Sequence, residues 1–223
     1  EYLLKAKNIN DIYKNKIDNS YFTIVTDLED LYNRKGFYNE AEKTLKRAIE
    51  ITEFEDEKVL FYLSLSDLYI KKRSFKKAEE NLLRALEIDQ ENIRGAHKNV
   101  HYILKKLGDL YKSQGLYKKA EENYLKSLLL VEKKFGLNNS FSAIVYGSLG
   151  HLYSRADLDA QGETLIALLE KAEENYLKAL DISKIIYGEN NFQTKKLYED
   201  LGYFYLIREE PKKAEDFFLK SLK

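Results

Sequence analysis

One pattern recurs five times along this chain: a Tyr is followed by an Ala at a fixed distance. The distance is nine residues in four copies and nineteen in the fourth copy, and successive tyrosines lie 37, 42, 42 and 52 residues apart. The tyrosines are Tyr32, Tyr69, Tyr111, Tyr153 and Tyr205, and the alanines are Ala41, Ala78, Ala120, Ala172 and Ala214. A period in this range is typical of small structural units that stack on their neighbours. We therefore predict a repeat array with a ten-residue insertion in its fourth copy.

Each copy is predicted to form two helices. Apolar residues recur three and four positions apart on two consecutive stretches, as at Leu104 and Leu107 and then at Ala120 and Tyr124. Gly115 lies between the two stretches, where it marks a turn. The 223 residues include a single Pro, so long helices are permitted almost everywhere. The sequence predicts an all-α fold made of helical hairpins.

Polar clusters suited to capping helix N-termini precede several of the first helices, as at Asn19-Ser20, Asn138-Asn139-Ser140 and Asn190-Asn191. These clusters separate the predicted repeats, which together form one domain over residues 1–223. Residues 1–17 are expected to be the second helix of a partial, earlier repeat. The predicted repeats cover about 20–54, 57–93, 95–136, 140–188 (with the insertion within 154–171) and 192–223.

The third repeat resembles the tetratricopeptide repeat. Residues 107–128 read LGDLYKSQGLYKKAEENYLKSL and carry the Leu-Gly, Tyr, Gly, Tyr, Ala and aromatic sites of that family in order. The string KAEENYLK occurs at 119–126 and again at 171–178, which indicates duplication of a unit. The 42-residue spacing is similar to the kinesin light chain type. The resemblance implies a right-handed superhelical solenoid.

The repeat spacing also suggests how the two helices of a hairpin pack. We expect the small residues Ser66, Gly108, Gly150 and Gly202 to let the second helix approach closely, with the repeat Ala against them. Tyr124, Tyr176 and Phe218 are expected to fill the space towards the next repeat. Glu29 stands at the small-residue site of the first repeat, so looser packing is expected there.

Composition narrows the class of protein. Lys+Arg and Asp+Glu number 37 each, so no net charge draws the chain to nucleic acid or to anionic lipid. No apolar run is long enough to span a membrane. The chain has no Cys and therefore no disulfide or thiolate chemistry, which fits a reducing compartment. We predict a soluble, cytoplasmic protein.

The resemblance implies a concave groove that is lined by the first helix of each repeat and binds a protein or peptide. Three aligned acids, Asp30, Asp67 and Asp109, suggest a stripe for a basic or polar peptide, and they would repel the C-terminal carboxylate that some members of the family bind. The alternative is a solvated face. The candidate groove residues are Asp30, Asn33, Arg34, Leu63, Asp67, Ile70, Lys105, Asp109, Lys112, Gly147, His151, Ser154, Arg155, Glu199 and Tyr203.

The insertion is the most individual feature of the chain. It is predicted to form a longer turn followed by two extra helical turns before the ordinary second helix. Four apolar residues of this extension are candidates for a dimer or effector contact, because exposed apolar patches often mark interfaces. The alternative is that they fold back onto the adjacent hairpin. These residues are Leu165, Ile166, Leu168 and Leu169.

Neither metal nor catalytic chemistry is indicated. His97 and His101 lie four residues apart, but no third ligand is evident and the Glu of a zincin helix is missing. No Gly-rich phosphate-binding loop is present. The carboxylates recur with the repeat period, as expected for side chains on the solvent-facing side of each helix. We expect no cofactor, no metal and no enzymatic activity. His151 is the only His on the predicted groove face, where a simple surface role is expected.

The sequence therefore predicts a scaffold that binds a protein or peptide through its concave groove. Two alternatives remain open at this point. The array could be the sensor or regulatory arm of a larger protein that carries a nucleotide-binding switch, a caspase-like protease or a DNA-binding effector. It could also be a structural module that self-associates through the insertion or through open ends of the solenoid.

Overall fold

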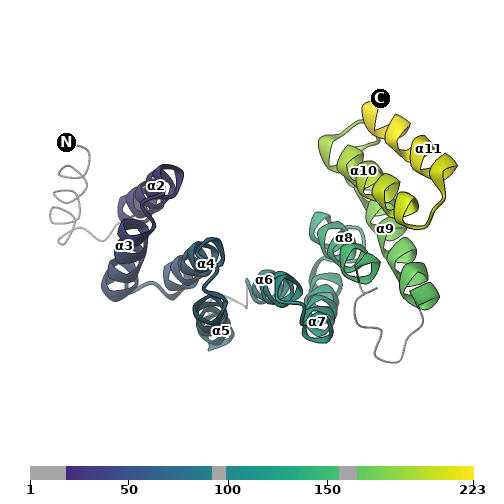
Figure 1. Ribbon diagram of the computed structural model, residues 1–223. Coiled ribbons are helices and arrows are strands. Elements are labelled where there is room, and N and C mark those ends of the chain that lie inside the picture. Colours follow the sequence, from purple (N-terminus) through teal and green to yellow (C-terminus); the bar gives the residue numbers. More distant parts are fainter. Residues whose placement is uncertain (1–18, 92–98, 156–164) are drawn as a thin grey trace. The chain divides into compact units, whose positions relative to one another are not determined.

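The computed structural model describes residues 19–91, 99–155 and 165–223, and these residues form helices joined by short turns and bends (Figure 1). The predicted all-α fold is confirmed. Contacts between residues divide the chain into two compact units, Glu1–Ile103 and Leu104–Lys223. The helix predicted for residues 1–17 lies outside the described residues.

Consecutive helices pair into hairpins, in the order that the repeat pattern predicts. Within the described residues the helices are α2 (Asn19–Lys35), α3 (Tyr38–Ile51), α4 (Glu55–Lys71), α5 (Phe75–Glu91), α6 (Val100–Ser113), α7 (Tyr117–Phe135), α8 (Ser140–Ser154), α9 (Leu165–Tyr187), α10 (Phe192–Ile207) and α11 (Pro211–Leu222).

The repeat Ala lies at the centre of each second helix's buried face. In α3 the fully buried residues are Ala41, Leu45 and Ala48, which are four and three positions apart and so share one face of the helix. Ala78 and Leu82 have the same places in α5. A side chain as small as that of Ala lets two helices approach closely, which explains why this position recurs.

The small residue of the first helix packs differently from the sequence-based expectation. A Cβ atom on Gly108 would lie 2.6 Å from the ring of Tyr124, and a Cβ on Gly150 would lie 2.7 Å from the ring of Tyr176. The aromatic ring of the same hairpin therefore covers the glycine, whereas we had expected the repeat Ala there and the ring towards the next repeat. Only the absence of a side chain on the first helix leaves room for the ring.

The first hairpin is adapted to Glu29. Its second helix carries the fully buried Leu45 at a position that is Leu82 in the second hairpin and an aromatic residue in the last three hairpins. Glu29 is half-buried and accepts a hydrogen bond from the side-chain amide of Asn33. A smaller side chain on the second helix accompanies the larger one on the first, so looser packing does not follow from Glu29.

The ends of the helices follow local sequence signals. The side chain of Asn139 accepts a hydrogen bond from the backbone N–H of Ser142, and that of Asn191 accepts one from Gln193, as the predicted capping clusters require. The turn between α6 and α7 carries Gly115 at φ +74°, a backbone conformation that glycine adopts without steric cost.

A hydrogen bond that the sequence analysis did not anticipate joins neighbouring hairpins within each unit. The hydroxyl of Tyr69 donates to Glu42, which directly follows the repeat Ala of the preceding hairpin. In the second unit, Tyr205 donates to Glu173 at 2.6 Å in the same way. The ammonium of Lys213 lies 4.9 Å from the ring centroid of Tyr205 on the ring's face. The repeat tyrosine is therefore held by its own hairpin and by the preceding one.

Helix α9 contains the described part of the insertion. Leu169 corresponds by register to Tyr117, where α7 begins, whereas α9 begins at Leu165. The extension within the described residues is therefore about one helical turn. The remainder of the insertion, in which a second extra turn was predicted, lies outside them.

Candidate functional site

The second unit contains a groove of about 400 Å³ between α8 and α10. Lys105 of α6 and the C-terminal end of α9 complete its walls. Its size is that of a site for a small ligand or for a few residues of a peptide. Lys105, Gly147 and His151, which the sequence analysis placed on the groove face, all line it.

Apolar side chains make up one part of this groove and remain partly open to solvent. Ile144 of α8 is 52% exposed and Phe192 of α10 is 76% exposed. Leu197 of α10 faces Gly147 of α8, since a Cβ on Gly147 would lie 3.6 Å from a methyl group of Leu197. The apolar wall is thus formed by the first helices of two successive hairpins.

A hydrogen-bonded network forms another part of the groove and connects three helices. The hydroxyl of Tyr176 on α9 lies 2.8 Å from Nδ1 of His151 on α8, and Nε2 of His151 lies 3.3 Å from Oδ2 of Asp200 on α10. The rings of His151 and Tyr176 meet edge to face, with 5.2 Å between centroids. His151 is therefore held in place on both sides, whereas a simple surface role was expected.

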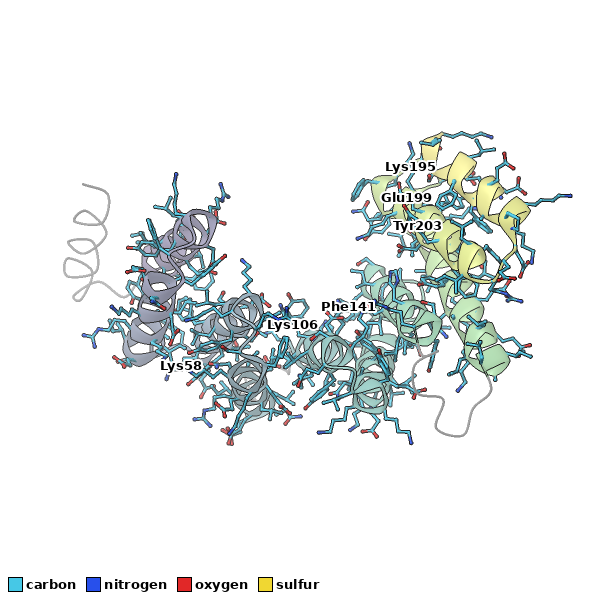
Figure 2. The ribbon with its side chains drawn as sticks, viewed as in Figure 1. Lys58, Lys106, Phe141, Lys195, Glu199 and Tyr203 are labelled. Atoms are coloured by element: carbon cyan, nitrogen blue, oxygen red, sulfur yellow. The ribbon has the colours of Figure 1, made fainter. Side chains whose placement is uncertain are left out.

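Asp200 was missed by sequence reasoning. Transfer by repeat register selected its neighbour Glu199, which is exposed. Figure 2 shows Lys195, Glu199 and Tyr203 projecting from one side of α10. The ring of Tyr203 lies 5.1 Å from that of Phe218 and is 63% exposed. The residues of α10 that line the groove are one helical position away from those expected.

Of the three acids of the predicted stripe, Asp30 and Asp67 belong to the first unit and Asp109 belongs to the second. Asp30 and Asp109 each have a partner within their own unit. Asp30 pairs with Arg34 in α2. Burial, with a smaller effect from the charges of Asp30 and Asp67, raises the pKa of the Glu29 carboxyl in the same unit. In the second unit Asp109 accepts a hydrogen bond from Tyr124 and pairs with Lys105, each at 2.7 Å. Asp109 therefore supports the fold of its own hairpin.

Two of the candidate groove residues, Leu63 and Ser154, are buried and do not line the groove. Leu63 is 5% exposed and belongs to the core of the first unit, so it is not available to a ligand. Ser154 is 8% exposed, and its hydroxyl donates to the carbonyl of His151 and lies 3.4 Å from the hydroxyl of Tyr176. The structure places Ser154 behind His151, not on the surface of the groove.

Two cations among the candidate groove residues, Lys112 and Arg155, differ from Asp30 and Asp109 in their pairing. The side chain of neither residue has an ion pair or a hydrogen bond among the residues that the structure describes. Lys112 is partly buried, and this burial lowers the pKa of its ammonium group. The attraction of Asp109 opposes that effect, and Lys105, Arg155 and Asp200 are also near enough to act on its charge. Within the described part of the chain, both cations are therefore available to an anion.

The insertion residues divide into two pairs. Leu165 and Ile166 are 50% and 70% exposed, as expected for a contact surface. Leu168 is 8% exposed and Leu169 is half-buried, so this pair packs against the protein. A contact through the extension of α9 stays a prediction for Leu165 and Ile166 and is wrong for Leu168.

The described residues contain neither a metal-binding cluster nor a membrane-spanning helix. No group of three or more His, Asp or Glu side chains is arranged to hold a metal ion there. His97, one of the pair considered above, lies outside these residues. Within the same limits, no helix combines the length and apolar character that crossing a bilayer requires.

Comparison with known proteins identifies the repeat. The model of the tetratricopeptide repeat family matches residues 60–92 and 104–130. No curated protein matches the chain. Several solved structures share the fold, among them BtubC (BKLC) from P. vanneervenii, with a TM-score of 0.77, 22% identity, and coverage of 97% of this chain and 84% of that one.

Two further solved structures have the same fold at lower identity. Nearly identical TPR-like repeats assigned to a kinesin light chain of Podospora anserina give a TM-score of 0.69 at 15% identity, covering 92% of this chain and 95% of that one. The pilF protein of Pseudomonas aeruginosa gives a TM-score of 0.62 at 16% identity, covering 92% and 76%. At these identities the likeness concerns the fold alone.

Proposed function

Because the chain is built from tetratricopeptide repeats, we propose that it is a non-catalytic scaffold that binds a peptide segment of a partner protein between α8 and α10. The observation that carries the proposal is the groove of about 400 Å³ in the second unit. Its wall combines exposed apolar side chains, Ile144 and Phe192, with the fixed polar pair His151 and Asp200. Apolar lining with a few well-placed polar groups is the usual composition of a ligand site.

The groove is also formed by rigid elements. Its residues come from helices, and His151 is fixed by contacts with α9 and α10. A site whose side chains are held before the ligand arrives loses less conformational entropy on binding. This supports recognition of one particular peptide chemistry in preference to general adhesion to apolar surfaces.

The test begins with selection of peptides from a random displayed library on the intact chain. Peptides that are retained are synthesised with a fluorescent label, and their Kd values are measured by anisotropy. We expect the double variant Ile144→Gln, Phe192→Gln to weaken binding at least tenfold, because it removes exposed apolar contacts of the groove.

A matched control uses Leu129→Gln with Ile185→Gln. These residues are 68% and 67% exposed and do not line the groove. We expect this control to bind the peptides like the unchanged chain. Recovery of no peptide, or equal loss of affinity in both double variants, would show that the groove is not the binding site.

A further inference from the structure

The charged side chains near Asp200, a residue of the groove lining, are unevenly paired. The carboxylate of Asp109 is occupied by Lys105 and by the hydroxyl of Tyr124, and that of Asp200 faces His151. Lys112 and Arg155 have no such partner among the described residues. Among the described residues, Asp109 and Asp200 are thus engaged within the protein, while Lys112 and Arg155 are not paired with an acid.

Partial burial makes this arrangement costly for Lys112. An ammonium group that loses contact with water without gaining an anion is destabilised, and the lowered pKa of Lys112 reflects this. Arg155 lies close enough to add repulsion. A carboxylate brought by a ligand would offset both effects and could accept charge-assisted hydrogen bonds from the two side chains.

A third cation lies within the groove itself. Lys196 of α10 lines the groove and has no ion pair in the described part of the chain. The apolar residues Ile144 and Leu197 line the same groove. The charge in the groove that has no ion pair among the described residues is therefore positive and lies beside apolar side chains, which is the complement of a ligand that is apolar and negative.

We propose that the bound peptide is acidic: an apolar side chain lies between α8 and α10, and a carboxylate side chain contacts Lys112 and Arg155. This inference rests on the proposed function and specifies the chemistry of its ligand. It is opposite in charge to the basic or polar peptide that the three-acid stripe suggested.

Geometry also sets the spacing within the peptide. Ile144 and Arg155 are eleven positions apart on α8 and its C-terminal cap. At a rise of about 1.5 Å per residue this corresponds to about 16 Å along the helix. An extended peptide advances about 3.3 Å per residue. The acidic side chain is therefore about five residues from the apolar one.

The test uses the peptides selected on the intact chain. We expect Asp or Glu to be enriched about five residues from an apolar anchor, and we expect replacement of that acid by its amide to raise Kd roughly tenfold. Arg155→Gln, at an exposed position, should raise Kd by a similar factor for the acidic peptide and leave Kd for the amide peptide unchanged. Such coupling in a double-mutant cycle identifies a direct interaction.

Lys112→Gln extends the cycle, with thermal unfolding measured alongside because Lys112 is partly buried. Glu199→Gln is the control, since this exposed charge lies outside the groove lining. Selected peptides without acid enrichment, or acidic and amide peptides that respond equally to Arg155→Gln, would overturn the inference. If those peptides still depended on Ile144 and Phe192, the proposed function would stand. Peptides whose Kd did not depend on Ile144 and Phe192 would contradict both the proposed function and this inference.

Discussion

At the residue scale, the size of one side chain on the first helix is matched to one side chain on the second. Gly150 lies under the ring of Tyr176, and Gly202 lies under the ring of Phe218. The second hairpin pairs Ser66 with Leu82, and the first hairpin pairs the larger Glu29 with Leu45. The pair of residues, not the glycine alone, determines how closely the two helices pack.

Gly150→Ala tests this match. The new Cβ would lie 2.7 Å from Cδ1 and 2.8 Å from Cγ of Tyr176, so the ring or the helix must move. We expect a loss of roughly 1–3 kcal/mol in the free energy of unfolding from overpacking, reduced by the gain of up to about 1 kcal/mol that Ala brings to a helix.

Gly147→Ala is the matched control on the same helix. Its Cβ would make an ordinary contact of 3.6 Å with Leu197, so the helical gain should dominate and the variant should be as stable as the unchanged chain or more so. Chemical denaturation of the two variants measures the difference. Equal stability of the two variants would show that the ring does not require the glycine.

At the element scale, the turns between paired helices keep one shape with different residues. Gly36 and Gly115 have positive φ at a position four residues after the repeat Tyr. Arg73 and Glu209 hold the corresponding position with φ of 56° and 59°. A side chain in this conformation costs about 1–2 kcal/mol. The packing of the paired helices therefore imposes the turn, and glycine only lowers its cost.

Leu168 determines how the start of α9 is held. This residue is 8% exposed, whereas Leu165, one turn earlier, is 50% exposed. We expect Leu168→Ala to cost about 2 kcal/mol or more in unfolding free energy through lost burial and a residual cavity. Leu165→Ala should change it by less than about 0.5 kcal/mol. Equal effects in thermal denaturation would mean that the extension does not pack as described.

At the scale of the whole molecule, hydrogen bonds from each hairpin to the one before it connect the repeats within a unit. In the first unit Tyr69 and Lys72 of α4 both donate to Glu42 of α3. The hydrogen bond from Lys46, together with those from Lys72 and Tyr69, lowers the pKa of Glu42 to about 2 in spite of its partial burial. This carboxylate couples two successive hairpins as long as it is ionised.

The stability that Glu42 contributes should therefore depend on pH. Because its pKa is lower in the folded chain than in the unfolded chain, the contribution is complete above about pH 5 and is lost as the pH falls towards about 2. We expect Glu42→Gln to make the decrease in unfolding free energy over this range shallower. Tyr69→Phe, which removes one donor, should have a smaller effect. Parallel curves for the variants and the unchanged chain would contradict this role.

The repeat fold could be predicted from sequence because its determinants recur at fixed spacing: the repeat Tyr, the repeat Ala and the glycine of the turn. The capping residues Asn139 and Asn191 were predictable for the same reason, since their hydrogen bonds are local. The groove was less predictable. Asp200 is one position from the residue that register selects, and its role depends on how α10 is rotated against α8.

The charge of the groove was not predictable from residue types. Asp109 looked available in the sequence, but Tyr124, fifteen residues later, donates to it once α6 and α7 pair. Lys112, only three positions from Asp109, has no ion pair among the described residues. Which charges stay available depends on contacts between helices, and a sequence pattern does not contain these.

The hydrogen bonds that the repeat tyrosines make between hairpins also bear on how such a chain can evolve. Each bond needs one Tyr on the later hairpin and one Glu beside the Ala of the earlier one, as in Tyr205 with Glu173 and Tyr153 with Glu121. The hydrogen bond is the same at each of these junctions. A copied hairpin inserted in register therefore already carries the Tyr and the Glu that its two new junctions need. Lengthening the array by duplication therefore requires no compensating mutation at the new boundary, and the octapeptide shared by residues 119–126 and 171–178 is the trace that such an event would leave.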